Sequence, residues 1–199
     1  MQRILPTETN LKLVDSTIHY YPNFFNREEA DFLFQCLRST VPWQQDKIQV
    51  FGKEYLQPRL TALYGNNGKN YSYSHITMEP HTFTSELLKI KNKVDNHCNV
   101  DFTTCLINLY RNGKDSNGWH ADNEKELGAD PIIASVSLGE ERFFHLKHRA
   151  CKAQRYKLLL EPGSLLVMSG ETQKYWLHQI PKTSRILDER INLTFRVIK

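Results

Sequence analysis

The sequence has few cysteines and lacks any closely spaced pair of them. None of its four cysteines forms a C-x-x-C pair, which argues against a zinc knuckle or a dithiol redox motif and predicts reduced thiols. No apolar run is long enough for a signal peptide or a membrane span. We therefore expect a soluble, intracellular protein without a membrane partner, cytoplasmic if bacterial and nuclear if eukaryotic.

Low-complexity tracts and internal repeats are also absent, which excludes a solenoid and a disordered chain. The length of 199 residues suits one domain with a well-buried core and is short for two. The net charge of +4 allows an anionic polymer as partner without requiring one. We expect a single domain over residues 1–199.

Two segments of the first half have the apolar spacing of amphipathic helices. One opens at Asn26 and ends before Pro42, and the other runs from about residue 84 to residue 98. In the second helix, we expect Lys91 and the neighbouring lysines on the solvent side.

From residue 102 onward the apolar pattern changes to a period of two, which predicts strands. The expected strands cover residues 102–111, 132–138, 142–147, 156–160, 164–168 and 190–198. Helices followed by such a run of strands predict an α+β, mainly β fold, a helix-supported sandwich or jelly roll. The mouth of such a fold is a natural place for a metal and a small co-substrate.

Two histidines and one aspartate have the composition of a metal site. His120 and Asp122 lie two residues apart, and His178 follows 58 residues after His120. Two imidazoles and one carboxylate are the facial set that holds non-haem iron(II) with three positions open. A His-x-Asp pair alone is a weak indication, since such pairs occur by chance in many domains.

The last expected strand has a polar, cationic face. Arg190, Asn192, Thr194 and Arg196 alternate with apolar residues, so they lie on one side of the strand. A guanidinium is planar and always charged, and it binds a carboxylate through two hydrogen bonds. The two arginines can therefore bind opposite ends of one short dianion.

Asn108 and Tyr110 share a face of the strand expected at residues 102–111, so both can point into the cavity that the last strand faces. The plain alternatives are a hydrogen-bonded core network for these two and a solvated edge strand for Arg190 and Arg196. Because the metal-type ligands and the arginine strand occur together, the sequence favours an oxygenase that binds a dicarboxylate co-substrate.

These motifs resemble the AlkB family of iron(II)- and 2-oxoglutarate-dependent dioxygenases. The matching pattern extends from Val50 to Arg196, and its most specific part is the final Arg-x-Asn-x-Thr-x-Arg. The resemblance implies a double-stranded β-helix (jelly roll), with supporting helices and a nucleotide-recognition lid in residues 1–100 and the catalytic core in residues 101–199. It also implies Fe(II) as cofactor, with 2-oxoglutarate and O2 as co-substrates.

The resemblance further implies a role for each residue of the site. The metal ligands would be His120, Asp122 and His178. The 2-oxoglutarate site would comprise Asn108, Tyr110, Arg190, Asn192, Thr194 and Arg196. The implied activity is DNA repair by direct reversal: oxidative demethylation of N-alkylated bases such as 1-methyladenine and 3-methylcytosine, releasing formaldehyde, succinate and CO2.

Substrate contacts are implied mainly in the first half. Phe51, Gly52 and Lys53 resemble the finger of the branch that repairs double-stranded DNA, where the apolar side chain enters the base stack. The plain alternative is a hairpin turn whose Phe folds inward. Tyr71 and Tyr73 would line the pocket of the flipped base, although paired tyrosines on a short strand are often only packing.

Asn123 and Glu124 follow the metal ligands and would accept hydrogen bonds from an exocyclic amino group of the base. The branch that repairs double-stranded DNA has an acidic residue where this sequence has Asn123, so the contact with a positively charged base falls to Glu124. The expected partner is alkylated duplex DNA, with single strands as the second choice, and a repair enzyme that clamps a duplex is expected to act as a monomer. Phosphate contacts are expected from Lys53, Arg59, Lys147, His148, Arg149, Lys152 and Arg155.

Other readings stay open. The same chemistry could act on tRNA or mRNA, because a wedge does not exclude structured RNA. A zinc-dependent hydrolase could use the His/Asp/His set, although it would not need two arginines aimed at the cavity. A nucleic-acid-binding protein that has lost catalysis would not need a complete set of metal ligands.

Overall fold

The computed structural model describes residues 8–50, 52–69, 71–73 and 76–198. For residues 49, 50, 71–73, 76 and 77 it describes the backbone alone.

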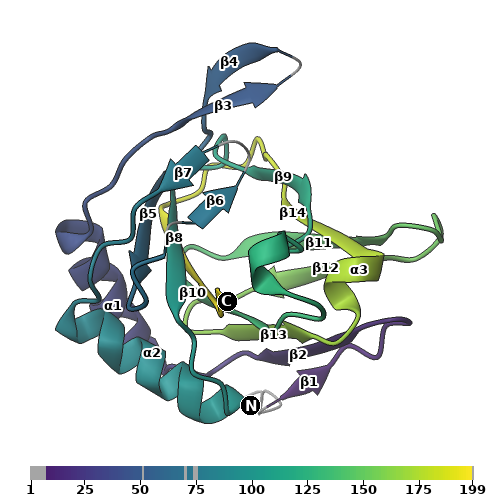
Figure 1. Cartoon of the computed structure of the whole chain (residues 1–199), viewed down its shortest axis with the longest axis horizontal. Coiled ribbons are helices and arrows are strands. Elements are labelled where there is room, and N and C mark those ends of the chain that lie inside the picture. Colours follow the sequence, from purple (N-terminus) through teal and green to yellow (C-terminus); the bar gives the residue numbers. More distant parts are fainter. Residues whose placement is uncertain (1–7, 51, 70, 74–75, 199) are drawn as a thin grey trace.

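Two antiparallel sheets form the body of the molecule (Figure 1). In spatial order, the larger sheet contains β1 (Thr9–Asn10), β2 (Thr17–Tyr21), β13 (Leu165–Ser169), β10 (Ile133–Gly139), β15 (Arg190–Arg196), β8 (Thr104–Tyr110) and β5 (Leu60–Gly65). The smaller sheet contains β12 (Arg155–Leu160), β11 (Arg142–His148), β14 (Trp176–Ile180) and β9 (Asn117–His120). A 3-10 turn, η1 (Lys125–Leu127), and the short α3 (Thr172–Tyr175) connect strands.

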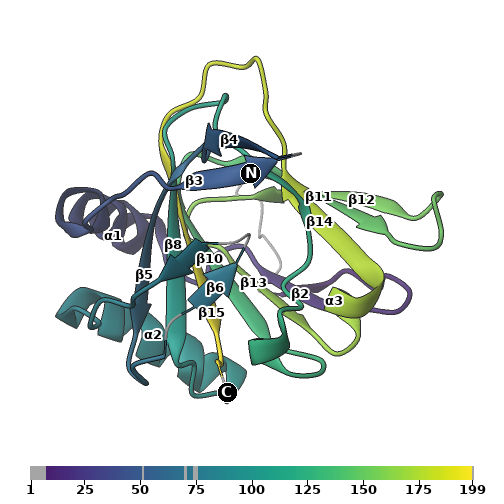
Figure 2. The same cartoon turned by 45° about the horizontal axis from the view of Figure 1, so that its top comes forward.

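Helices α1 (Arg27–Thr40) and α2 (Ser85–Cys98) cover the outer face of the larger sheet (Figures 1 and 2). The predicted start of α1 is confirmed: the Asn26 side chain accepts from the Glu29 backbone N–H, and the Glu29 carboxylate accepts from the Asn26 N–H. This capping box satisfies two backbone donors that the helix leaves unpaired. The predicted fold class, α+β and mainly β, is also confirmed.

The prediction that Lys91 lies on the solvent side of α2 is wrong. The residue is 4% exposed, and its Nζ bonds Asp95 at 2.5 Å and Asp101 at 2.7 Å. The two carboxylates compensate the charge of Lys91, and the apolar stem of a lysine side chain tolerates burial. A lysine between the apolar positions of a helix can therefore still lie on its buried side.

Strand β15 separates two layers of core. Ile191, Leu193 and Phe195 pack toward the helices, together with residues of α1 and α2. The alternate residues of the strand face the space between the two sheets, where a second apolar cluster includes Phe144 and Met168. The strand pattern therefore directs its polar side chains into the interior of the jelly roll.

Two hairpins extend the first half of the chain: β3 (Lys47–Val50) pairs with β4 (Lys53–Leu56), and β6 (Tyr71–Tyr73) pairs with β7 (Ile76–Met78). The β3–β4 hairpin projects from the body at the top of Figure 1. Gly52 has a φ of 76° at its turn, a conformation that favours glycine. Phe51 lies outside the described residues, as do the side chains of Tyr71 and Tyr73. Among the residues that the structure describes, no helix is long and apolar enough to cross a membrane.

Candidate active site

The pairing of β8 with β15 brings the two predicted polar faces together. Tyr110 lies opposite Arg190, and Asn108 lies opposite Asn192. All four side chains line a cavity of about 60 Å³ between the two sheets, which Arg196 also lines. The fold therefore brings the polar faces of β8 and β15 into one cavity, as the alternation of polar and apolar residues in both strands predicted.

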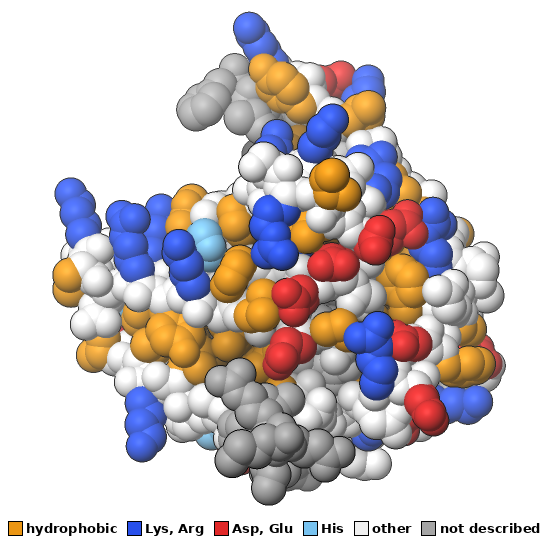
Figure 3. Space-filling view, turned by 180° about the vertical axis from the view of Figure 1, so that it is seen from behind, with side chains coloured by type: hydrophobic (Ala, Val, Ile, Leu, Met, Phe, Trp, Pro, Cys, Tyr) orange, Lys and Arg blue, Asp and Glu red, His pale blue; other side chains and the backbone are white. Residues whose placement is uncertain are grey.

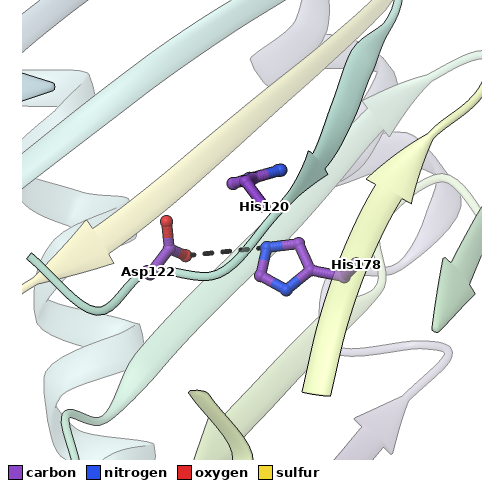
Figure 4. Close-up of side chains that lie close together, drawn as sticks. All are labelled: His120, Asp122 and His178. Atoms are coloured by element: carbon purple, nitrogen blue, oxygen red, sulfur yellow. Dashed lines mark ion pairs between the residues drawn. The ribbon is translucent and has the colours of Figure 1, made fainter. Parts of the chain in front are cut away.

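His120, Asp122 and His178 enter this cavity from its other side. The candidate ligand atoms of the three side chains all lie within 4.8 Å of one another. His120 ends β9, His178 lies in the neighbouring β14, and the register places the two histidines directly opposite each other. Figure 4 shows the three side chains converging, with Nε2 of His178 3.9 Å from Oδ2 of Asp122.

Hydrogen bonds fix the orientation of this cluster. Nδ1 of His120 lies 2.7 Å from the carbonyl oxygen of Gly118, which accepts only, so Nδ1 carries the proton. Nε2 then has a lone pair, which accepts from Nδ2 of Asn117 at 3.1 Å. Asp122 accepts from Nη2 of Arg196 through Oδ1 at 2.8 Å. The backbone N–H of Asp122 donates to Oε1 of Gln173 at 2.9 Å.

The electrostatics keep the three side chains in the protonation states that bind metal. Burial, followed by the neighbouring His120, lowers the pKa of His178 to about 3. Burial also lowers the pKa of His120. Burial alone would raise the pKa of Asp122, but Arg196 and then His178 outweigh it and lower this pKa to about 2. At neutral pH the site therefore contains two neutral imidazoles and one carboxylate, the donor set of a non-haem iron(II) site.

Arg190 is a buried cation whose hydrogen bonds are incomplete. It is 1% exposed, and its Nη2 donates to Oγ of Ser137 at 2.9 Å. Among the described residues, its Nε and Nη1 have no hydrogen-bond partner. Burial lowers its pKa to about 10, so the group is still charged at pH 7. A charged fork with two unused donors in a cavity fits the carboxylate of a small anion.

Asn192 and Thr194 are bonded within the protein. Nδ2 of Asn192 donates to Ser135 Oγ at 2.8 Å and to the Val136 carbonyl at 3.1 Å, while Oγ1 of Thr194 donates to Oδ1 of Asn192 at 3.1 Å. Both side chains line the cavity, and these bonds hold them in place.

Of the residues expected at the substrate base, Glu124 lines the cavity and Asn123 does not. Asn123 is exposed at the surface. The Oε2 atom of Glu124 is buried, with no hydrogen-bond partner in the part of the chain that the structure describes. Gly52 and Lys53 are exposed on the β3–β4 hairpin.

Two of the expected phosphate contacts are wrong. Arg59 is 4% exposed, lines the cavity and donates from Nε to Oδ1 of Asn108 at 2.8 Å. His148 is buried and pairs with Asp15, and its Nδ1 accepts from the backbone of the turn that follows β11. Whether a lysine, arginine or histidine side chain is buried cannot be predicted from its place in the sequence alone, because the residues that pair with it lie in distant segments.

Sequence reasoning also missed the contributions of Gln173 and Arg142. Gln173 bonds the backbone of Asp122 from α3. Arg142 is 3% exposed and donates to the carbonyls of Asn112, Asp115 and Pro181, which joins the loops beside the cavity. Neither residue belongs to a motif, so only the fold reveals them.

Comparisons with known proteins identify the family of this chain. The family described as "2OG-Fe(II) oxygenase superfamily" matches residues 17–196. The human "Alpha-ketoglutarate-dependent dioxygenase alkB homolog 3" is 40% identical over 192 residues, covering 92% of this chain and 66% of that protein. The mouse "DNA oxidative demethylase ALKBH2" is 36% identical over 188 residues, covering 89% of this chain and 79% of that protein.

The chain spans 64–66% of the length of the alkB homolog 3 relatives that it matches. A solved structure described as "The structure of OsALKBH1" covers 98% of this chain and 99% of its own, with a TM-score of 0.64 and 17% identity. That likeness supports the fold alone.

Proposed function

The chain belongs to the 2OG-Fe(II) oxygenase superfamily and, within it, to the AlkB family, and from this premise we propose that it demethylates alkylated bases of nucleic acid by oxidation. Its cofactor is then Fe(II), and its co-substrates are 2-oxoglutarate and O2. The observation that carries the proposal is the closeness of the His120, Asp122 and His178 ligand atoms, within 4.8 Å of one another, in the cavity that Arg190 lines.

In this proposal the metal is held by His120, Asp122 and His178, and Arg190 binds one carboxylate of 2-oxoglutarate. Asn108, Tyr110, Asn192, Thr194 and Arg196 complete the co-substrate site. When bound, the metal and 2-oxoglutarate supply the oxidation by O2 that hydroxylates the methyl group, after which formaldehyde leaves the base. The protein residues orient the reactants and exclude water between the sheets.

We propose alkylated DNA as the substrate, with duplex preferred and with 1-methyladenine and 3-methylcytosine as the lesions. Both lesions carry positive charge. The buried Oε2 of Glu124, which has no partner among the described residues, can accept a hydrogen bond from the amino group of such a base. Both also block Watson–Crick pairing, so they cost less to flip than an intact base. Phe51, Gly52 and Lys53 would serve as the wedge, while Tyr71 and Tyr73 would stack on the flipped base.

The basic side chains of the β11–β12 hairpin support contacts with phosphates. Arg149, Lys152 and Arg155 are exposed there, and Lys147 is half-buried. Seen from behind, lysine and arginine side chains gather along the edge of the molecule on the side of this hairpin (Figure 3). Such contacts would position the nucleic acid and make its binding sensitive to salt.

The same chemistry on single-stranded DNA or RNA is the second candidate. It rests on the exposed Arg149, Lys152 and Arg155, because such side chains can contact the phosphates of a single strand or of RNA as well as those of a duplex.

The decisive assay compares 3-methylcytosine in duplex DNA, single-stranded DNA and RNA of one sequence. Formaldehyde and succinate are measured with Fe(II), ascorbate and 2-oxoglutarate present. We expect release that depends on both the lesion and 2-oxoglutarate, and that is at least as fast on duplex as on single strands. Faster release on RNA would favour the second candidate, and consumption of 2-oxoglutarate without formaldehyde would reject methylated nucleic acid as the substrate.

A further inference from the structure

The backbone around Asp122 lies outside the strand ladders. β9 ends at His120, and residues 121–124 have no regular structure before η1 begins. The Asp122 backbone N–H donates instead to a side chain, Oε1 of Gln173, at 2.9 Å. A buried N–H needs such an acceptor, because leaving it unpaired costs free energy.

Gln173 is itself held in one orientation. The residue is 1% exposed, and its Nε2 donates to Sδ of Met168 at 3.6 Å. An amide flipped by half a turn would present N–H groups to the N–H of Asp122, with no acceptor between them. The side chain therefore directs its oxygen toward Asp122.

Gln173 also connects two segments that are distant in sequence. It lies in α3, directly before β14, which carries His178. The hydrogen bond to Asp122 thus ties the segment of the candidate carboxylate ligand to the turn that leads into a candidate histidine ligand.

We propose that Gln173 is a positioning residue for the metal carboxylate, an inference that rests on the proposed metal site. Gln173 holds the main chain of Asp122, and Arg196 holds its Oδ1. The Oδ2 atom of Asp122 then lies on the side of His178, 3.9 Å from Nε2 of that residue. Partners of this kind set the direction of a ligand, and their loss typically lowers metal affinity about 10–100-fold.

The test is a titration of metal-free protein with Mn(II), without turnover. Gln173→Met keeps an unbranched side chain of similar length and removes the acceptor. We expect it to bind Mn(II) at least about tenfold more weakly than wild type. The absorption spectrum of the Co(II)-loaded variant should also change in band position or intensity, because the carboxylate can rotate.

Thr172→Val is the matched control. Thr172 is the neighbouring residue of α3, is also 1% exposed, and bonds Thr17 and the Ser169 carbonyl but not Asp122. We expect this variant to lose thermal stability while it keeps the Mn(II) affinity and the Co(II) spectrum of wild type.

The inference is overturned if Gln173→Met binds Mn(II) like wild type, or if Thr172→Val loses as much affinity as Gln173→Met. A wild-type protein that binds no Mn(II) would instead overturn the proposed metal site, so the two failures are separated by the wild-type titration.

Discussion

Arg196 donates from Nη2 to Oδ1 of Asp122 at 2.8 Å, and both side chains are buried. The second arginine of the polar strand is thus bonded to a candidate metal ligand, whereas Arg190, at the other end of the strand, keeps two donors without a partner among the described residues. β15 therefore joins the metal half of the site to the half that suits a dianion. Its two arginines are alike in sequence pattern but differ in environment.

Two substitutions of Asp122 should separate its role as a metal ligand from its role as the partner of Arg196. Asp122→Ala should abolish turnover and lower the free energy of unfolding of metal-free protein by about 3–5 kcal/mol, because Arg196 loses the partner of a buried ion pair. Asp122→Asn keeps an acceptor for Arg196, so it should also abolish turnover but cost less stability. Formaldehyde release and urea denaturation measure the two effects. Turnover at the wild-type rate in either variant would reject the metal assignment.

Replacing Arg190 should change stability and co-substrate binding in opposite directions. Arg190→Met should weaken 2-oxoglutarate binding by about 2–3 kcal/mol, the loss of a charged hydrogen-bond pair. The unloaded protein should be as stable as wild type or more stable, because the substitution removes a buried cation, two of whose donors have no partner in the described part of the chain. Calorimetric titration of Mn(II)-loaded protein and thermal unfolding provide the two measurements.

Arg38→Met is the control for Arg190, because Arg38 pairs with Glu189 at the surface, away from the cavity. It should leave the affinity for 2-oxoglutarate unchanged. Weaker binding in both arginine variants would mean that general charge, rather than the fork of Arg190, attracts the dianion.

Local patterns predicted the elements whose causes are local. The helix from Asn26 was predicted because its capping box lies within four consecutive residues. The strand from residue 190 was predicted because its alternation is uninterrupted. β9 and β14 were not predicted as strands, although they carry both histidines. β9 has an exposed Gly118 and Trp119, and in β14 the apolar Trp176, Leu177 and Ile180 do not alternate with the polar residues, so neither sequence shows the apolar period of a strand.

The candidate metal ligands could be predicted from the sequence, but the residues that hold the site in place could not. His120, Asp122 and His178 belong to a chemically recognisable set. Arg59 and Gln173 contact this site only because segments more than 45 residues apart meet, as their bonds to Asn108 and Asp122 show. No spacing rule connects such pairs, since their separation depends on the whole topology.

The wedge can be tested without a view of Phe51, which lies outside the described residues. Phe51→Ala should lower activity on duplex DNA at least about tenfold more than on single strands, because only a duplex has a stack to fill after the base leaves. Tyr55→Ala is the control, since Tyr55 is an exposed aromatic residue of the β3–β4 hairpin. Equal losses of formaldehyde release on both substrates would contradict the wedge.

Glu124 should discriminate between charged and neutral lesions. Its Oε2 is buried in the cavity with no partner among the described residues, so a positively charged base would provide a charge-assisted hydrogen bond. Glu124→Gln keeps the shape and removes the charge. We expect kcat/KM on 3-methylcytosine to fall about tenfold, the equivalent of about 1.4 kcal/mol. Activity on neutral 3-methylthymine should change much less.

Asn123→Ala is the control, because Asn123 is exposed and does not line the cavity. It should leave kcat/KM unchanged on both bases. An equal loss on both bases in Glu124→Gln would show that Glu124 shapes the cavity and does not read the charge of the lesion.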